Sequence, residues 1–431
     1  MTRRVIFILL LAIISNVILA AVLPKVDGWS SETARIAASI ANGQGFSSPF
    51  RESTGPSAWI PPVYPYLLAG IFVVFGVFTV TSLCIAVGIN LIIHAFTCIV
   101  LYRAAGQAFG PRVGFYSACA LAGFPLLFYP LVVLHVLGGY GGTGLFISPN
   151  IIWYTHMSEL AIVLLIWLTL RPPHWALLGM AWGIAALLNP TVLAVAPAFG
   201  IWQLRNGKGW RYLGSAGFVA MLCIAPWLIR NYLVFHQPVF IRDNLGVELR
   251  VGNQPGQNGR WSGELHPDRS DYELGRVIHM GELGYSRTCG QEALQTIRAR
   301  PGEFFRSVVL RFGYWWIGNP MESRHLGKLR FVKYLPQLMF SILAFIGAGL
   351  ALRSNDKNAF LFVAVLLFYP LIYYVTHTFE GFTYQYPMHP EMLALAASAV
   401  VRRGSAMAQT AKPFARIHSK LSHFSKRRAA A

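Results

Sequence analysis

The sequence predicts an all-α polytopic membrane protein with about ten transmembrane helices, an outer juxtamembrane helix and one extracytoplasmic subdomain. Of its 431 residues, 55% are hydrophobic and only 12% are charged, against about 25% charged residues in ordinary soluble domains. The mean hydropathy is +0.49, and apolar runs of about 20 residues, the length that spans a bilayer, recur along the chain. One long polar stretch interrupts these runs.

The N-terminus predicts an uncleaved first transmembrane helix that runs from inside to outside. Arg3 and Arg4 precede an apolar stretch at 5–23, which is longer than a signal-peptide core and long enough to span a membrane. Further apolar runs follow at 81–102, 113–134, 150–170, 174–188, 191–204, 212–232, 332–352, 358–376 and 387–401. The expected parts are therefore an N-terminal transmembrane module at 1–235 with a first outer loop at 24–80, an extracytoplasmic subdomain at 236–330, C-terminal transmembrane helices at 331–402 and a basic cytoplasmic tail at 403–431.

One more apolar run, at 64–78, decides the topology, because counting it as a span would reverse every later segment. If it does not cross, the loops that carry Arg103, Arg171 and Arg205 lie in the cytoplasm together with the basic tail, as the positive-inside rule requires. The run is also short for a span, so we expect an interfacial or re-entrant helix at the outer face. The prediction is a multi-pass protein of the cell's inner (plasma) membrane with both termini cytoplasmic.

The net charge of +19 is interpreted as topology rather than as a nucleic-acid footprint. The cations lie in short loops between apolar runs and in the tail, where they suit anionic membrane lipids, so nucleic acid is not an expected partner. Nine of the 17 acidic residues lie at 243–303, within the predicted extracytoplasmic subdomain.

Two patterns that often mark cofactor or metal sites are set aside. The run "GYGGTG" at 139–144 matches a dinucleotide-binding fingerprint, but it lies between membrane helices and lacks the preceding strand that such a site needs. The five cysteines show no metal-ligand spacing. The expectation is therefore that no cofactor is used and that no cluster in the sequence requires a metal.

Two carboxylates near the membrane are candidates for function, because an ionisable group at that depth is costly to keep. Glu159 lies close to the start of an otherwise uncharged span, and Glu32 begins a helix that follows Ser30 and Ser31 on the first outer loop. The alternative for Glu32 is a first-turn charge that complements the helix dipole. The alternative for Glu159 is a snorkelled or hydrogen-bonded acid.

Arg230, in "APWLIRNYLVF", is a cation at the outer end of a span and so departs from the positive-inside trend. A lipid phosphate at the outer interface would explain it, because a guanidinium matches phosphate oxygens well. The alternative is an arginine that snorkels to the headgroups or pairs with Glu32 or another loop acid.

Several stretches together resemble a known family. They are "ETARIAASIANGQGFSSPF" followed by "TGPSAWIPPVYPYLLAGIFVVFGVF", then "AWGIAALLNPTVL", "APWLIRNYLVF" with "IRDNLGVELRVGNQPG", "RPGEFFRSVVLRFGYWW" and "YQYPMHPEMLALA". In these stretches, which span nearly the whole chain, the sequence resembles the GT-C superfamily of membrane glycosyltransferases. The branch it is similar to contains protein O-mannosyltransferases, aminoarabinose transferases and bacterial relatives.

The resemblance implies a hexosyltransferase that moves a sugar from a polyprenyl-phosphate-linked donor to a glycan, lipid or protein acceptor at the outer (periplasmic) membrane face. Its general base would be an acid of the first outer loop, which assigns that role to Glu32 and makes Glu159 a second acid that orients substrate. Relatives usually carry Asp near the position of Ser31. Three possibilities stay open: Glu32 substitutes, Asp27 reaches in, or catalysis is reduced.

The resemblance assigns substrate binding to residues of the matching stretches, namely Arg230, Asn231, Arg242 and Asn244. Relatives usually have Arg where Gln385 stands, so lipid-phosphate binding would rest on Arg230 and Arg242. Trp59 and Tyr64 are candidates to stack on sugar or flank a prenyl chain, with membership of the interfacial aromatic belt as the alternative.

Two other functions are compatible with the sequence. A transporter or flippase for a lipid-linked substrate would often show paired halves with broken helices and polar groups at mid-membrane depth, whereas here the informative acids gather at one face. A catalytically inactive GT-C-like binding protein would explain the absence of the expected Asp.

Overall fold

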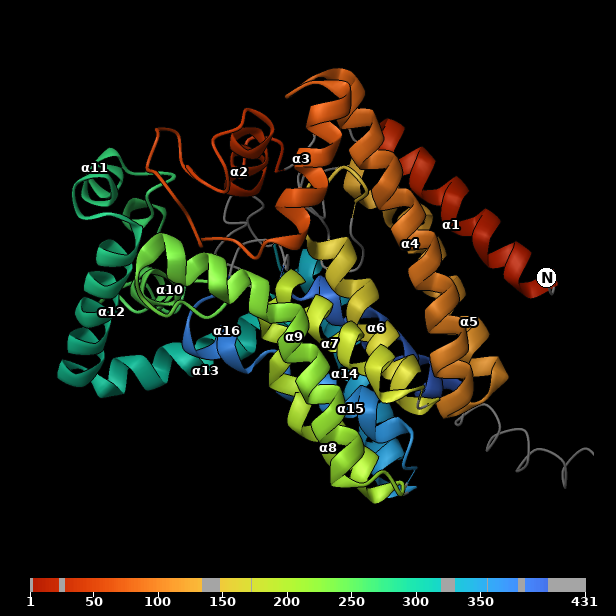
Figure 1. The fold of residues 1–431 in the computed structure, drawn as a ribbon. Helices are drawn as coiled ribbons and strands as arrows, with labels where there is room; N and C mark the ends of the chain where they lie inside the picture. Colours follow the sequence, from red (N-terminus) through yellow and green to blue (C-terminus); the bar gives the residue numbers. More distant parts are fainter. Residues whose placement is uncertain are drawn as a thin grey trace, which may run out of the picture.

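The computed structural model describes residues 3–22, 28–133, 148–171, 173–318, 330–354, 356–378 and 384–401. In this part the chain is built of helices and connecting turns, with two isolated β-bridges and no β-strand (Figure 1). The all-α class predicted from the sequence is confirmed for these residues. The predicted tail at 403–431, the glycine-rich motif at 139–144 and the candidate residue Asp27 lie outside them.

Within the described residues, four apolar segments are long enough to cross a bilayer. They are α1 (Arg3–Val22), α4 (Val80–Phe109), α9 (Trp210–Phe235) and the part Tyr334–Arg353 of α14 (Arg330–Arg353). Shorter apolar helices lie at other predicted spans: α6 (Thr155–Leu170), α7 (Trp175–Leu188), α15 (Ala359–Phe368) and α16 (Leu371–Val375). Several long apolar helices indicate a multi-pass membrane protein. The number of about ten crossings and their direction stay predictions.

The remaining predicted spans are also helical. The run at 113–134 corresponds to α5 (Pro111–Val133), and the run at 387–401 corresponds to η5 (Tyr386–Met388) and helical residues 389–401. The run at 191–204 is divided into η1 (Pro190–Val195) and α8 (Ala196–Arg205). Pro190 has no backbone N–H to continue α7, and the side chain of Asn189 accepts the N–H of Thr191 at 3.2 Å, so a new helix begins there.

Small residues let the membrane helices approach one another closely. A Cβ atom added to Gly179 of α7 would collide with the backbone oxygen of Ala216 on α9, and one added to Gly183 would lie 2.8 Å from the backbone oxygen of Ala220. In a bilayer this kind of backbone contact drives helix association, because burial of apolar side chains between helices gains little over lipid.

The outward faces of the long helices are apolar. On α1 and α9 the exposed large side chains include Phe7, Leu10, Ile14, Phe218, Leu222 and Ile229. Exposed apolar surface of this extent marks an interaction surface, and lipid is the partner that the length of these helices indicates.

The first outer loop contains α2 (Glu32–Ala41) and α3 (Val63–Phe75), which share one buried apolar cluster. α3 ends at Gly76, and Thr79 then caps α4 by accepting the N–H of Ser82 at 3.1 Å. Val73 and Val74, at the end of α3, are 68% and 71% exposed and form an apolar tip. Such a tip suits the interfacial docking predicted for 64–78, although its membrane position stays a prediction.

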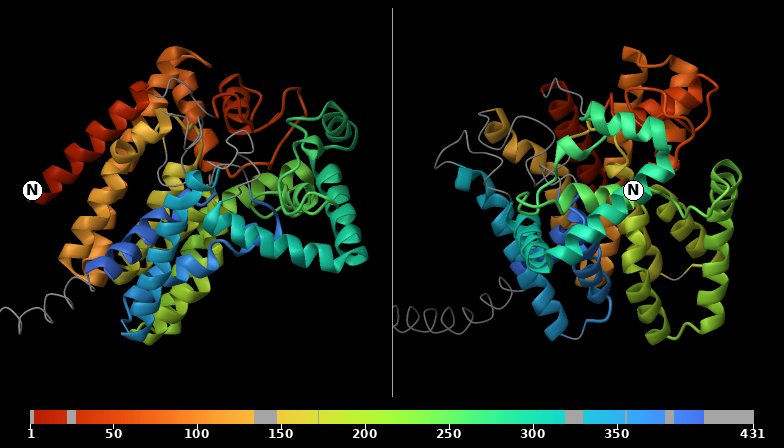
Figure 2. Two further views of the ribbon diagram at one scale, coloured as in Figure 1. Left: turned by 180° about the vertical axis from the view of Figure 1, so that it is seen from behind. Right: turned by 90° about the vertical axis from the view of Figure 1, so that its left-hand side faces the viewer.

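The long polar stretch forms a helical group beside α2. It consists of η2 (Gly263–Leu265), α10 (Leu245–Gly252), α11 (Asp271–Met280), α12 (Glu282–Ala299) and α13 (Pro301–Ile317). Figures 1 and 2 show these helices gathered to one side of the long apolar helices. α9 ends at Phe235, at the predicted start of the subdomain, but the domain boundaries themselves stay predictions.

A buried ion network holds this helical group together. Arg250 of α10 lies 2.9 Å from a carboxylate oxygen of Glu273 on α11 and 2.6 Å from one of Glu292 on α12. The Tyr285 hydroxyl donates to Glu273 at 2.8 Å. Removing one member of such a buried network leaves an uncompensated charge, so these contacts fix how α10, α11 and α12 pack.

Candidate functional site

A cavity with about 1090 Å³ of open space lies between the N-terminus of α2, the loop before α6 and the beginning of the helical group α10–α13. Four of the residues predicted from the sequence line it: Glu32, Trp59, Arg242 and Asn244. Their neighbours on the wall include Tyr154, Glu248, His266, Asp268 and Tyr384. The structure therefore brings together side chains that are more than 200 positions apart in the chain.

A tight turn places Glu32 on the cavity wall. Gly28 has φ +81°, and a Cβ atom there would lie 2.5 Å from the backbone oxygen of Ile152. The hydroxyl of Ser31 donates to the carbonyl of Gly28 at 2.6 Å, and its backbone N–H donates to the same oxygen at 3.1 Å. Only glycine fits both the positive φ and this close approach, so the turn presses the start of α2 against the loop before α6.

The environment of Glu32 disfavours its charged form. The side chain is only 14% exposed, and its Oε1 lies 3.9 Å from Nε2 of His266. Burial raises the pKa of Glu32 from 4.5 to about 7, and the negative charge of Asp268 adds to this rise. A carboxylate with a pKa near neutrality accepts a proton more readily than an ordinary glutamate does.

His266 is held in one tautomer beside Glu32. Its Nδ1 accepts the backbone N–H of Asp268 at 3.2 Å, so in the neutral ring the proton lies on Nε2, which faces Glu32. Burial lowers the pKa of His266, which keeps the ring neutral. The edge of the ring also contacts Trp59, with centroids 5.8 Å apart. His266 therefore presents an N–H group toward the Glu32 carboxylate, at a distance longer than a hydrogen bond.

Arg242 provides a cation on the same wall. Its Nε donates to the carbonyl of Trp59 at 3.0 Å, and one terminal nitrogen lies 3.7 Å from a carboxylate oxygen of Glu248. Asn244 donates to that same oxygen at 2.7 Å. The remaining N–H groups of the guanidinium are the donors that an anionic ligand in the cavity would meet.

A second chamber, with about 1020 Å³ of open space, adjoins the first. The two share a wall made of Tyr154, Arg242, Asn244, Glu248 and Tyr384. The other side of the second chamber is largely apolar and includes Pro190, Phe240, Leu245, Ile372 and Tyr373. A ligand with a charged group at Arg242 and an apolar chain beside Phe240 fits this pair of chambers.

Three predicted binding residues lie elsewhere. The guanidinium of Arg230 donates to the carbonyls of Ser57 at 2.6 Å and Phe46 at 2.8 Å, so it ties the first outer loop to α9. Asn231 is buried next to it and donates to the carbonyls of 239 and 240 at 3.4 Å each. Tyr64 is 3% exposed and belongs to the apolar cluster under α3. None of these three lines the cavity that contains Glu32.

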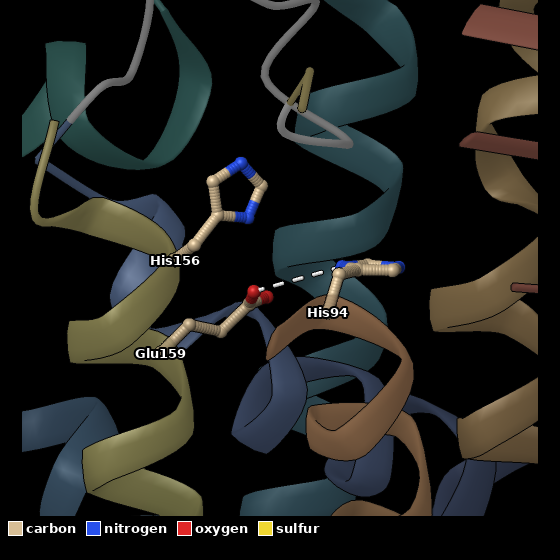
Figure 3. A group of neighbouring side chains, drawn as sticks. All are labelled: His94, His156 and Glu159. Atoms are coloured by element: carbon tan, nitrogen blue, oxygen red, sulfur yellow. Dashed lines mark ion pairs between the residues drawn. The ribbon is translucent and has the colours of Figure 1, made fainter. Parts of the chain in front are cut away.

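Glu159 also lies away from this cavity. It is 1% exposed on α6, and its Oε2 lies 3.9 Å from Nδ1 of His94 on α4 (Figure 3). The structure thus places the two predicted acids, Glu32 and Glu159, in different environments, and the role proposed for Glu159 as a substrate-orienting acid has no support from the cavity lining. Its carboxylate is buried, and its role as an acid that orients substrate stays a prediction.

The polar wall residues that were not predicted from the sequence include Glu248, His266 and Asp268. All three lie in the long polar stretch, where nothing in the sequence sets a site residue apart from the other polar residues. The run "HPD", which contains His266 and Asp268, was a local indication of a functional histidine, because a residue two positions later can fix the tautomer of the ring.

Comparisons with known proteins bear on the fold. No family model and no curated protein matches the chain. Among solved structures, the oligosaccharyltransferase of Archaeoglobus fulgidus, in complex with zinc and sulfate, is similar with a TM-score of 0.50 at 11% identity. The chain shares the GT-C fold of this structure. The match covers 94% of this chain and 50% of that protein, so the chain spans about half the length of this GT-C structure.

A second GT-C structure is similar at a lower level. It is ArnT of Cupriavidus metallidurans, solved bound to undecaprenyl phosphate, with a TM-score of 0.39 and 12% identity over 94% of this chain and 80% of that one. The resemblance read from the sequence is confirmed for the fold by the match to the oligosaccharyltransferase, while activity and substrate belong to the proposal that follows.

Proposed function

We propose that the protein transfers a sugar from a polyprenyl-phosphate-linked donor to an acceptor at the outer membrane face, with Glu32 as general base. The observation that carries the proposal is the shared cavity, in which Glu32 and Arg242 line one space that opens into a largely apolar chamber. A lipid-linked sugar needs a polar place for the sugar, a cation for the phosphate and an apolar place for the chain.

The chemistry follows from these groups. The Glu32 carboxylate takes the proton of an acceptor hydroxyl as that oxygen attacks the anomeric carbon, and Arg242 stabilises the negative charge on the departing polyprenyl phosphate. The Nε2–H group of His266 faces Glu32 from 3.9 Å and is the nearby polar group that a small movement would bring into contact with the carboxylate. Because no second carboxylate acts as nucleophile in this scheme, the anomeric configuration is expected to invert.

The test is a panel of polyprenyl-phosphate sugars, supplied to the purified protein in liposomes. The proposal expects one donor class to be cleaved, with release of polyprenyl phosphate. Movement of intact donor across the bilayer would favour a flippase instead. Saturable binding of polyprenyl phosphate, with no cleavage of any donor, would favour an inactive GT-C-like binding protein.

Donor turnover is expected to depend on pH with an apparent pKa near 7. The base acts only when deprotonated, and burial raises the pKa of Glu32 to about 7, so kcat/KM should fall about tenfold per pH unit below 7 and level off above it. The measurement is kcat/KM between pH 5 and 9. A rate that stays flat down to pH 5 would mean that no group with this pKa serves as the base.

Arg242→Met is expected to weaken donor binding by about 10- to 100-fold, because a charge-assisted hydrogen bond to a phosphate contributes about 1.5–3 kcal/mol. The Kd for polyprenyl phosphate, measured by titration, reports this loss. The matched control is Arg51→Met, since Arg51 lies on the first outer loop and pairs with exposed Asp271, outside the cavity. Equal Kd values for the two variants would show that Arg242 does not bind the phosphate.

A further inference from the structure

Three buried side chains converge between α4 and α6, outside the proposed active-site cavity. They are His94 of α4 with His156 and Glu159 of α6, and they are 2%, 0% and 1% exposed. Each offers one potential ligand atom, and these atoms all lie within 4.8 Å of one another. Figure 3 shows the two rings and the carboxylate arranged around a common centre.

The atoms that face the centre have no hydrogen-bond partner in the protein. They are Nδ1 of His94, Nδ1 of His156 and Oε2 of Glu159. His94 Nδ1 and Glu159 Oε2 are 3.9 Å apart, which is beyond hydrogen-bond distance. A buried polar atom that stays unpaired destabilises the fold, and three such atoms at one point indicate a ligand that satisfies all three.

The outer atoms of both rings are engaged. Nε2 of His156 lies 3.0 Å from the carbonyl oxygen of Ser148 and must donate to it, so the neutral ring presents the lone pair of Nδ1 to the centre. Nε2 of His94 faces Sγ of Cys98 at 3.7 Å. A histidine that ligates a metal is commonly oriented in this way, through its other ring nitrogen.

We propose that His94, His156 and Glu159 bind a divalent transition-metal ion of the zinc class. Two imidazole nitrogens and one carboxylate oxygen suit zinc, whereas magnesium and calcium prefer oxygen ligands alone. At bond lengths of about 2.0–2.1 Å, tetrahedral ligand atoms lie about 3.4 Å apart, so side chains whose ligand atoms now lie within 4.8 Å of one another must move closer together to bind the ion. The ion also compensates the buried carboxylate.

The site would stabilise the wall of the active-site cavity. Ser148 begins the described part of the loop that continues to Ile151 and Tyr154 on that wall, and Asn90 of α4 donates to the carbonyl of Ile151 at 3.0 Å. An ion between α4 and α6 would fix the base of this loop. None of the three ligands lines the cavity, so the role is structural and does not depend on the proposed function.

The test measures metal on the full-length protein, purified in detergent with any affinity tag removed and dialysed against a weak chelator. Elemental analysis should find about one zinc per chain after equilibration with Zn²⁺ and fewer than about 0.1 in His156→Asn and Glu159→Gln, because losing one of three ligands weakens such a site by orders of magnitude. His389→Asn and Glu32→Gln should keep the metal, since His389 is a buried histidine and Glu32 a buried acid outside the cluster.

A second measurement uses the wild-type protein, so that it tests the proposal even if the variants fail to fold. Zn²⁺ added to the metal-free wild-type protein should raise its Tm in proportion to the logarithm of the zinc concentration, as binding to the folded state requires. Co²⁺ should give the visible absorption of a four-coordinate site. A wild-type protein that takes up neither ion, or a His156→Asn variant that binds zinc as the wild type does, would overturn the proposal.

Discussion

Replacing Glu32 with glutamine is expected to reduce donor turnover by about 10³-fold, since a positioned general base contributes about 10²- to 10⁴-fold to a rate. Glutamine keeps the shape of the side chain but cannot accept the acceptor's proton. Donor binding should change little, because the proposed phosphate contacts are made by Arg242. The measurement is kcat and KM for the donor, and the expected pattern is a loss of kcat with KM nearly constant.

The control for this substitution is Glu52→Gln, which removes an exposed acid of the same outer loop and should leave turnover unchanged. The effect of the substitution on folding is measured separately, as the pH dependence of stability. Because the pKa of Glu32 is about 7 in the folded protein and 4.5 when unfolded, folded-state stability falls as the pH rises from 4.5 to 7.

Ionisation of the buried Glu32 costs the folded state about 3 kcal/mol above pH 7, since each pKa unit corresponds to about 1.4 kcal/mol. Glu32→Gln removes this cost. The variant should therefore have a higher Tm than the wild type at pH 8, with a smaller difference at pH 5. A variant that is both inactive and less stable at pH 8 would show that Glu32 supports the fold rather than the reaction.

Arg311→Met is expected to destabilise the protein by about 3–5 kcal/mol, the second large effect, because it leaves buried acceptors without donors. Arg311 is fully buried on α13. Its guanidinium donates to the carbonyls of Gly252, Gly259, Tyr374 and Val375 and to the side chain of Asn253. One side chain thus joins α10, the turn at 252–259, α13 and the end of α16.

The readout for Arg311→Met is Tm in detergent, together with the yield of monodisperse protein. Arg306→Met is the matched control, because Arg306 is an exposed arginine on the same helix and its loss should change stability by less than about 0.5 kcal/mol. Similar Tm values for the two variants would mean that the buried hydrogen bonds of Arg311 are replaced without cost.

The helices were predictable from the sequence because a membrane span needs a run of apolar residues, and that requirement is local. Each predicted run coincides with helical structure in the described residues, and the break at Pro190 follows from the missing N–H of proline. The length of an apolar run does not predict how the helices pack against one another. The contact of Gly179 with Ala216 depends on which faces of α7 and α9 meet, and two apolar helices in a bilayer offer many such faces.

The site was predictable only in part. Glu32, Trp59, Arg242 and Asn244 were expected and share one cavity. His266 was not expected, because its importance comes from facing Glu32 across more than 200 residues of chain, and no local pattern encodes that distance. The metal-ligand cluster escaped detection for the same reason: His156 and Glu159 are neighbours on α6, but His94 comes from α4.

The partner of Arg230 in the structure differs from the partners expected from the sequence. Its position at the outer end of a span suggested a lipid phosphate or a loop acid as partner. In the structure it donates instead to the backbone carbonyls of Ser57 and Phe46, and its guanidinium lies 4.9 Å from the ring centroid of Trp227. Backbone carbonyls carry no sequence signature, so this partner was not readable from the chain.

The most direct measurement is the release of polyprenyl phosphate from a polyprenyl-phosphate sugar at pH 8, compared between the wild type, Glu32→Gln and Glu52→Gln in the same liposomes. If Glu32 is the general base, the wild type and Glu52→Gln release polyprenyl phosphate, and Glu32→Gln releases about 10³-fold less. Equal release by all three proteins would remove Glu32 as the base, and a donor that stays intact with all of them would contradict glycosyl transfer itself.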